Sequence, residues 1–267
     1  MHVFRLPTLC RWMAQFTALV VLTVITSACG ASSSPRGELA ENQQILAACD
    51  PTAPPASFIQ LDGTDSNNSA AIAEERMAAI ESIVRRTAVC SGHLRIVTFS
   101  VSSAATTVLF DGLLKLEGAT DNSRLKRVPA LVDEIMSQIK KEFEPARAAL
   151  PLGGSDVTAM YRLASEWIDQ VGDPFQLHLY LFTDGIQNVG VDLGSQILTD
   201  QAAIALADTF DVPQLPGASV VVAGLGRVAG PPLPSALAEG LVSFYNALCR
   251  QTKAAHCLSV TDYSVGR

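Results

Sequence analysis

Three short segments that lie far apart along the chain are rich in oxygen-bearing side chains. The first is "DGTDS", the second is "GGSD" and the third is "LFTDG". Five of their side chains, two carboxylates and three hydroxyls, suit a hard divalent cation whose octahedral shell is completed by water. The five candidate metal ligands are Asp62, Thr64, Ser66, Ser155 and Asp184.

The residue types in these segments favour magnesium over zinc. None of the three contains histidine or cysteine, which are the usual ligands of zinc. The hydroxyls carry no charge, so they leave the ion under-neutralised and able to attract a carboxylate from outside. We therefore expect Mg²⁺, with Mn²⁺ or Ca²⁺ able to substitute.

Other polar residues beside these segments are candidates for the rim of the same site, although each also suits a turn or a helix cap. A Gly/Pro loop at 226–234 follows a predicted strand on the same edge, and it either shapes specificity or is a connector. The candidate rim residues are Asn67, Asn68, Asp156, Asn188 and Asp192.

Predicted strands and helices alternate along the chain, as they do in α/β proteins with a parallel sheet. Residues 175–185 are nearly all apolar up to Thr183, the pattern of a central strand covered on both faces. A short turn of small residues joins two strands into a predicted hairpin. The predicted strands are 57–61, 94–100, 106–112, 175–185, 218–226 and 257–263. The predicted helices are 70–86, 124–148, 157–171, 199–209 and 235–251.

This order predicts a doubly wound α/β fold with a mostly parallel, six-stranded sheet and one antiparallel edge strand. In such sheets, ligands bind beyond the carboxyl ends of the strands. Asp62 and Asp184 each end a predicted strand, and Ser155 stands at the start of a helix. We therefore expect the three segments to meet at one edge of the sheet.

In this order and on these elements, the three motifs resemble the metal-ion-dependent adhesion site of von Willebrand factor type A domains. The resemblance spans about residues 55–263 and includes a hairpin strand that the family inserts after its second strand. It implies that the five candidate ligands hold a cation whose open position binds a Glu or Asp of a protein partner. Ser155 departs from the threonine more usual in the family, but it keeps the hydroxyl.

Other interpretations of these motifs remain open. Each motif alone also fits caps and turns around an inert fold, as in a structural envelope protein with a vestigial site. A metal-assisted phosphohydrolase with Asp62 as nucleophile is another possibility. It would be expected to carry D-x-D after the first strand, where this chain has Asp62-Gly63-Thr64, and no lysine-containing P-loop is present. We expect a binding module rather than an enzyme.

The first residues have the pattern of an export signal, because Arg5 and Arg11 precede a short apolar run and small residues. Ser27-Ala28 ahead of Cys29 resembles the bacterial lipobox, in which the cysteine is lipidated after cleavage. The expected location is therefore outside the cytoplasm, with a fatty-acyl (palmitate) anchor in the cell membrane or envelope. The expected organisation is a lipoprotein signal peptide at 1–28, a lipidated N-terminus and flexible tether at 29–48, and one type A-like domain at 49–267.

Charge argues against nucleic acid as a partner. Without Arg5 and Arg11, the exported chain keeps 17 basic residues against 26 acidic residues and contains no basic run. Such a chain favours a site for cations.

Four cysteines remain beyond the N-terminal segment, and an even number in an exported chain predicts two disulfides. Three pairings are possible. Cys49 and Cys90 each precede a strand expected to be adjacent and parallel, while Cys249 ends a helix and Cys257 begins the next strand. Local closure therefore predicts Cys49–Cys90 and Cys249–Cys257.

Overall fold

A computed structural model describes residues 35–67, 69–151 and 153–264 of the 267-residue chain. The expected signal peptide at 1–28, the lipidation candidate Cys29 and the rim candidate Asn68 lie outside these described residues.

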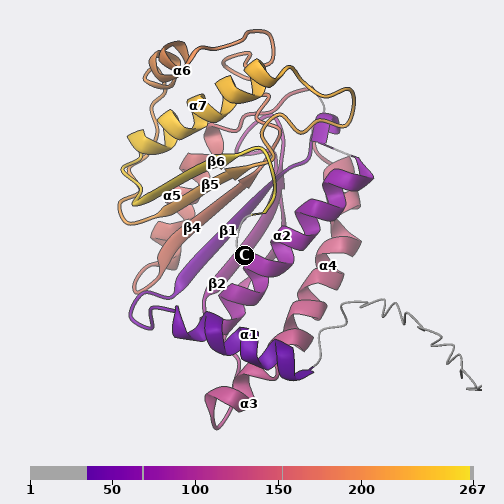
Figure 1. Cartoon of the computed structure of the whole chain (residues 1–267), viewed down its shortest axis with the longest axis vertical. Coiled ribbons are helices and arrows are strands. Elements are labelled where there is room, and N and C mark those ends of the chain that lie inside the picture. Colours follow the sequence, from indigo (N-terminus) through magenta and orange to yellow (C-terminus); the bar gives the residue numbers. More distant parts are fainter. Residues whose placement is uncertain (1–34, 68, 152, 265–267) are drawn as a thin grey trace, which may run out of the picture. The chain divides into compact units, whose positions relative to one another are not determined.

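The described elements follow the predicted alternation of strands and helices (Figure 1). The strands are β1 Pro55–Asp62, β2 His93–Phe99, β3 Thr106–Leu113, β4 Gln176–Phe182, β5 Ser219–Ala223 and β6 His256–Val260. The helices are α1 Pro35–Ala47, α2 Ala70–Val89, α3 Asp121–Leu125, α4 Val128–Ala148, α5 Ala159–Val171, α6 Asp200–Ala207 and α7 Ser235–Gln251, with a 3₁₀ turn, η1, at Asp65–Asn67.

The described strands form one six-stranded sheet in the order β3-β2-β1-β4-β5-β6. β2, β1, β4, β5 and β6 are parallel, and β3 pairs antiparallel with β2 at one edge. The predicted fold class is confirmed, and so is the predicted hairpin. The order reverses between β1 and β4, which is the switch point where doubly wound sheets bind their ligands.

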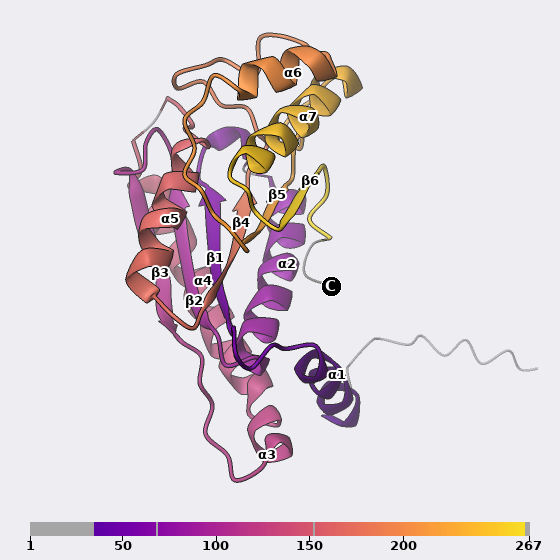
Figure 2. The same ribbon diagram turned by 90° about the vertical axis from the view of Figure 1, so that its left-hand side faces the viewer.

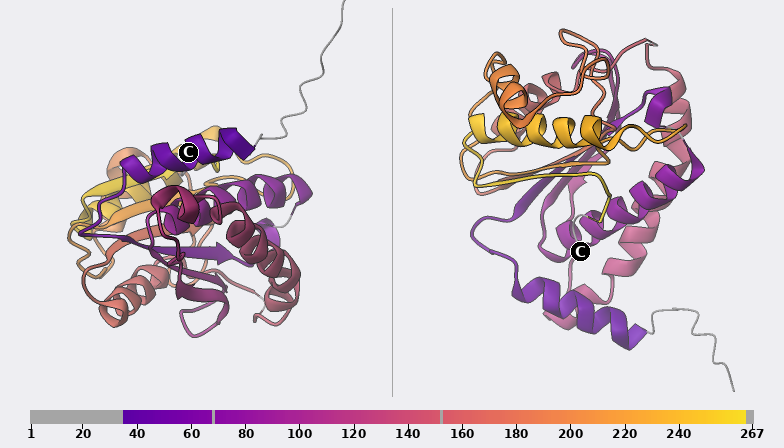
Figure 3. Two further views of the ribbon diagram at one scale, coloured as in Figure 1. Left: turned by 90° about the horizontal axis from the view of Figure 1, so that it is seen from below. Right: turned by 45° about the horizontal axis from the view of Figure 1, so that its top comes forward.

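Side chains alternate along each strand, so the sheet has a hydrophobic core on each face. Phe58 of β1 and Leu179 of β4 join a core with α5, α6 and α7, whereas Ile59 and Phe182 join a core with α2, α3 and α4. Figures 2 and 3 show the sheet lying between α5 on one side and α2 on the other. This two-sided cover holds the central strands, and therefore their carboxyl ends, in fixed positions.

The structure differs from the expected tether, because residues 35–47 form α1 and pack against the domain. Leu39 and Leu46 contact the core on the α2 face, and Asn42 is buried and donates from Nδ2 to the backbone oxygen of Leu125 at 3.3 Å. The polar composition of this segment conceals a stripe at positions 39, 42 and 46, one helical turn apart. Figure 1 shows α1 beyond the amino ends of the strands.

The long helix predicted at 124–148 is divided into α3 and α4. Thr120 forms a capping box with Ser123 and starts α3, and Pro129 lies in the first turn of α4, where proline is tolerated. Within the described residues, none of the helices has the length and apolar character needed to cross a bilayer.

Both predicted disulfides are present, Cys49–Cys90 and Cys249–Cys257. Cys49 lies between α1 and β1, and Cys90 caps the end of α2, so this bond closes the amino end of the sheet. Two disulfides indicate a protein of an oxidising compartment outside the cytoplasm.

The two disulfides should differ in their contribution to stability, because they close loops of 41 and 8 residues. Chain entropy predicts a loss of about 4 kcal/mol on replacing Cys49 and Cys90 by serine, and of about 2.5 kcal/mol for Cys249 and Cys257. Urea unfolding of the two double variants measures the free energies. Equal losses, or the reverse order, would contradict the assignment of the larger constraint to the amino end.

Candidate metal centre

The three oxygen-bearing segments meet at the switch point between β1 and β4. Asp62 is the last residue of β1, and Asp184 lies two residues beyond the end of β4. Gly63 allows the chain after β1 to pack closely, because a Cβ at this position would lie 2.6 Å from Leu150 Cδ1. Gly185 follows Asp184 with a φ of 79°, a conformation that favours glycine.

The carboxylate of Asp62 is the most heavily hydrogen-bonded group of the site, with only 1% of the residue exposed. Its Oδ1 accepts from the backbone N of Thr64 at 3.0 Å and from Thr64 Oγ1 at 2.7 Å. Its Oδ2 accepts from Ser155 Oγ at 3.1 Å and from Thr183 Oγ1 at 2.7 Å. Two of the predicted hydroxyls therefore converge on this carboxylate, that of Thr64 from the same segment and that of Ser155 from 93 residues further along the chain.

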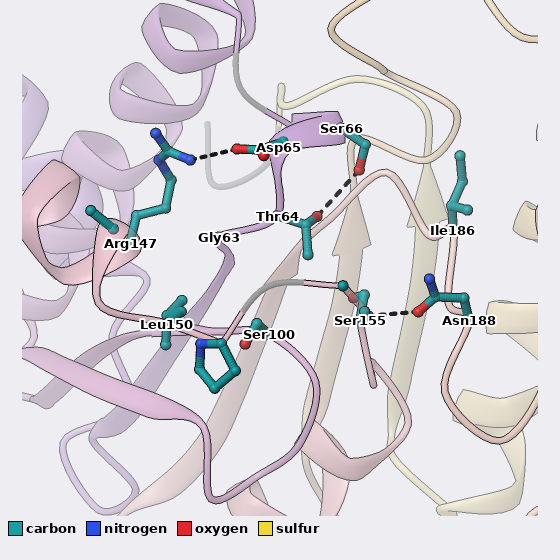
Figure 4. A pocket seen from close by; sticks show the side chains of 14 residues that line it. Gly63, Thr64, Asp65, Ser66, Ser100, Arg147, Leu150, Ser155, Ile186 and Asn188 are labelled. Carbon is teal, nitrogen blue, oxygen red and sulfur yellow. Dashed lines mark hydrogen bonds and ion pairs between the residues drawn. The ribbon is translucent and has the colours of Figure 1, made fainter.

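The two serines of the candidate set are placed by neighbouring polar groups (Figure 4). Ser66 Oγ lies 3.2 Å from Thr64 Oγ1, and the backbone N of Ser155 donates to Asn188 Oδ1 at 2.9 Å. Asn188 was a rim candidate, and it holds the turn that carries Ser155. The Thr64 and Ser66 hydroxyls thus form a short chain of oxygens that continues from Asp62.

Asp184 is fully buried but much less hydrogen-bonded than Asp62. Its Oδ1 accepts from the backbone N of Ile186 at 2.8 Å, whereas Oδ2 has no hydrogen-bond partner among the described residues. Burial, and next the negative charge of Asp62, raise the pKa of Asp184 to about 7, against the lowering effect of Ser66 and the Ile186 N–H. Without a cation, this carboxyl holds its proton up to about neutral pH.

The chemistry of the set fits a divalent cation. Two buried carboxylates repel each other, one carboxylate oxygen lacks a partner, and hydroxyls surround the space between them. Within the described residues, neither Asp62 nor Asp184 forms an ion pair with a basic side chain. No group of three or more His, Cys, Asp or Glu ligands occurs in the described ranges, so a metal here would depend on the hydroxyls.

A pocket of about 420 Å³ opens beside these hydroxyls (Figure 4). Thr64, Ser66 and Ser155 line it together with the apolar side chains of Leu150 and Ile186. A concave space with apolar walls and a few convergent polar groups is suited to one inserted side chain.

Arg147 also reaches this pocket, although no basic residue is adjacent to the acids in the sequence. Its guanidinium pairs with Asp65 at 2.9 Å and with Glu144 at 3.1 Å. These two carboxylates neutralise the positive charge of Arg147, so its guanidinium has little remaining charge with which to bind a phosphate.

The Gly/Pro loop after β5 is attached to two of the candidate segments. The backbone N of Gly226 donates to Asp184 O at 2.8 Å, and the backbone N of Ala229 donates to Ser66 O at 2.7 Å. The loop predicted at 226–234 therefore borders the site.

Other rim candidates have different roles. Asp156 accepts from the backbone N of Ala159 near the start of α5, and Asp192 accepts from the backbone N of Gly194 in a turn. The side chain of Asn67, like all of Asn68, lies outside what the structure describes.

Besides Arg147, two residues that contribute to the site are not among the sequence candidates. Thr183 donates to Asp62 but precedes Asp184 in an apolar strand, where it has no distinguishing pattern. Arg76 donates to the backbone oxygen of Asp62. The sequence feature that could have identified it is a charged residue on the apolar stripe of α2, between Ile72 and Ala79.

Neither protein-family models nor characterised protein sequences match this chain. Solved structures similar to it include the conserved hypothetical protein BatB from Bacteroides thetaiotaomicron, with 12% identity, a TM-score of 0.40, and coverage of 77% of this chain and 89% of the other. Manganese-loaded TRAP protein from Plasmodium vivax is 15% identical, with a TM-score of 0.38 and coverage of 80% and 70%. Proximal thread matrix protein 1 from the mussel byssus is 15% identical, with a TM-score of 0.40 and coverage of 82% and 46%.

The pKa of Asp184 predicts a stability effect when chelator removes divalent cations. Its folded pKa of about 7 lies above the ordinary 3.8, so its contribution to stability falls as pH rises from about 4 to 7. Asp184→Asn should therefore be more stable than the unmodified chain at pH 8 in chelator, by roughly 2–4 kcal/mol, and close to it at pH 4. Urea unfolding at both pH values measures the difference.

Asp192→Asn is the matched control, because this exposed carboxylate on the same loop only forms a turn. When Mg²⁺ replaces chelator at pH 8, the melting temperature of Asp192→Asn should rise, whereas that of Asp184→Asn should stay unchanged. Stabilisation of both variants in chelator would show that the effect does not come from the buried pair.

Proposed function

We propose that this chain is a cell-envelope lipoprotein whose domain binds a protein partner through a divalent cation, Mg²⁺ in the first place. The observation that carries the proposal is the buried pair Asp62 and Asp184, surrounded by hydroxyls, with Asp184 Oδ2 left without a partner. A buried, unpartnered carboxylate oxygen is costly, and a cation in this place would remove the cost. The motifs' resemblance to the adhesion site of type A domains supports the same interpretation.

Each residue of the set has a defined task in this proposal. Asp62 and Asp184 supply the charge that holds the cation, and Thr64, Ser66 and Ser155 supply neutral oxygens. When bound, the cation supplies an electrophilic position for a carboxylate of the partner. The adjacent pocket, with Leu150 and Ile186 in its wall, receives the aliphatic part of that acidic side chain.

Burial makes this contact sensitive to charge. Both carboxylates are almost completely excluded from water, so electrostatic interactions at the site are less screened than on an open surface. A partner whose acidic residue is reversed to lysine should lose binding, because a buried pair broken on one side leaves an uncompensated charge.

The proposed anchor agrees with the position of α1. The lipobox pattern ends at Cys29, and α1 starts at Pro35 and lies beyond the amino ends of the strands, whereas the candidate ligands lie at the carboxyl ends. A lipid at Cys29 would therefore tether the domain by the end opposite to its binding site.

Calorimetric titration of the full chain with Mg²⁺ and with Mn²⁺ tests the metal site. We expect one site per chain, lost in Asp62→Ala and in Asp184→Ala because each removes one of two charges. Asp192→Ala is the matched control: it lies in the loop after β4, is exposed, only forms a turn, and should retain binding. Turnover of a phosphate ester would favour a phosphohydrolase, and absence of binding would favour a vestigial site.

Capture of the partner tests the second half of the proposal. Envelope extract should yield a bound protein in Mg²⁺ and not in chelator, and Asp184→Ala should capture nothing under either condition. Equal capture by the unmodified chain and by Asp184→Ala would place the contact outside the metal centre.

Lipidation has its own test. Cells supplied with a fatty-acid analogue should label the unmodified chain but not Cys29→Ser, because that thiol is the proposed acyl acceptor. Cys90→Ser is a control for loss of a cysteine elsewhere and should remain labelled. Unchanged labelling of Cys29→Ser would overturn the anchor.

A further inference from the structure

A buried arginine lies directly behind the candidate metal centre. Arg76 of α2 is 1% exposed, although it is among the largest side chains that the described chain buries. It shares a helix face with Ile72, Ala79 and Ile80, which pack in the core between α2 and the sheet. Nothing in the helix itself requires a charge at this position.

The guanidinium of Arg76 is held without a carboxylate partner. Its Nη1 donates to the backbone oxygen of Asp62 at 3.4 Å, and its Cζ lies 5.0 Å from the centre of the Phe143 ring. Its Nε has no hydrogen-bond partner, and no acidic side chain of the described residues forms an ion pair with it. The nearby Glu144 is paired with Arg147 instead.

Burial of this charge lowers the stability of the fold, so its presence calls for a functional reason. Burying a charge that forms no direct ion pair costs several kcal/mol, and apolar residues of similar volume can replace buried charges without loss of stability. Burial lowers the pKa of Arg76, while Tyr263 and Asp62 oppose the fall, and arginine stays protonated in proteins. The positive charge is thus permanent, and the guanidinium donates a hydrogen bond to the backbone oxygen of Asp62, the first residue of the metal centre.

We propose that Arg76 sets the net charge of the metal centre and thereby makes it bind an anion. This inference rests on the proposed function. Asp62 and Asp184 carry together as much negative charge as a divalent cation carries positive charge, so without Arg76 the open position of the ion would attract a further carboxylate only weakly. The charge of Arg76 makes the loaded centre net positive, so that one carboxylate from a partner restores neutrality.

The role has two consequences of opposite sign. Arg76 repels the incoming cation and so weakens metal binding, but it attracts the carboxylate that follows and so strengthens ligand binding. A merely structural arginine would support the position of Asp62 and would strengthen both. The signs of the two effects therefore separate an electrostatic role from a structural one.

The test uses the full chain in detergent, with Mn²⁺ as the metal and acetate as the carboxylate probe. Electron paramagnetic resonance of free Mn²⁺ gives the metal affinity, and relaxation of water protons by bound Mn²⁺ reports displacement of its water by acetate. Arg76→Met should bind Mn²⁺ about three- to tenfold more tightly and acetate about three- to tenfold more weakly, the scale expected for one charge in a partly buried site. Arg76→Lys keeps the charge and should stay within about twofold of the unmodified chain in both.

Arg85→Met is the matched control. It makes the same substitution on the same helix, nine residues or about 14 Å further along the axis, and should change neither affinity. One contrary result is that the unmodified chain binds both Mn²⁺ and acetate while Arg76→Met weakens both affinities or changes neither. That result would overturn the role of Arg76 and leave the metal site standing. An unmodified chain that binds no Mn²⁺ would overturn the metal site and this inference together.

Discussion

Repulsion between two buried carboxylates is the constraint on which the rest of the site depends. Asp62 ends β1 and Asp184 follows the neighbouring β4, and both are excluded from water, yet their environments differ. Four hydrogen bonds stabilise the charge of Asp62, whereas Asp184 has one oxygen without a partner and a pKa of about 7. Such a pair is stable only with a proton, a cation or a nearby positive charge. The proposed metal and the positive charge of Arg76 both reduce this repulsion.

The fold separates the part that supplies stability from the part that binds. Cores on both faces of the sheet fix β1 and β4, and with them the two carboxylates. The Cys49–Cys90 disulfide and α1 close the amino end of the sheet, while the loops at the carboxyl end carry the hydroxyls. Charge repulsion at the site can thus be tolerated because stabilising features are concentrated elsewhere.

Patterns local to the chain predicted most of this architecture. Period-two and 3.6-residue hydrophobicity located the strands and most helices, and strand order then implied that Asp62, Ser155 and Asp184 would meet. α1 was missed because its composition is polar and its contacts come from only a few positions such as Leu39. Composition reports an average over a segment, whereas packing depends on one face.

Features that arise from tertiary contacts could not be predicted in the same way. Arg147 reaches the pocket because the end of α4 lies beside the loop of Asp65, a relation that no spacing in the sequence shows. The donation from Thr183 to Asp62 likewise depends on the register of β1 against β4. Arg76 did carry a signal, a charge within an apolar stripe, but only the fold reveals that Asp62 lies above it.

The most direct test of the metal centre is anomalous diffraction from a crystal grown with Mn²⁺. The account predicts one anomalous peak between Asp62 and Asp184, in contact with hydroxyls of the "DGTDS" and "GGSD" segments. A map with no peak at that position, from a crystal grown with the ion, would contradict it.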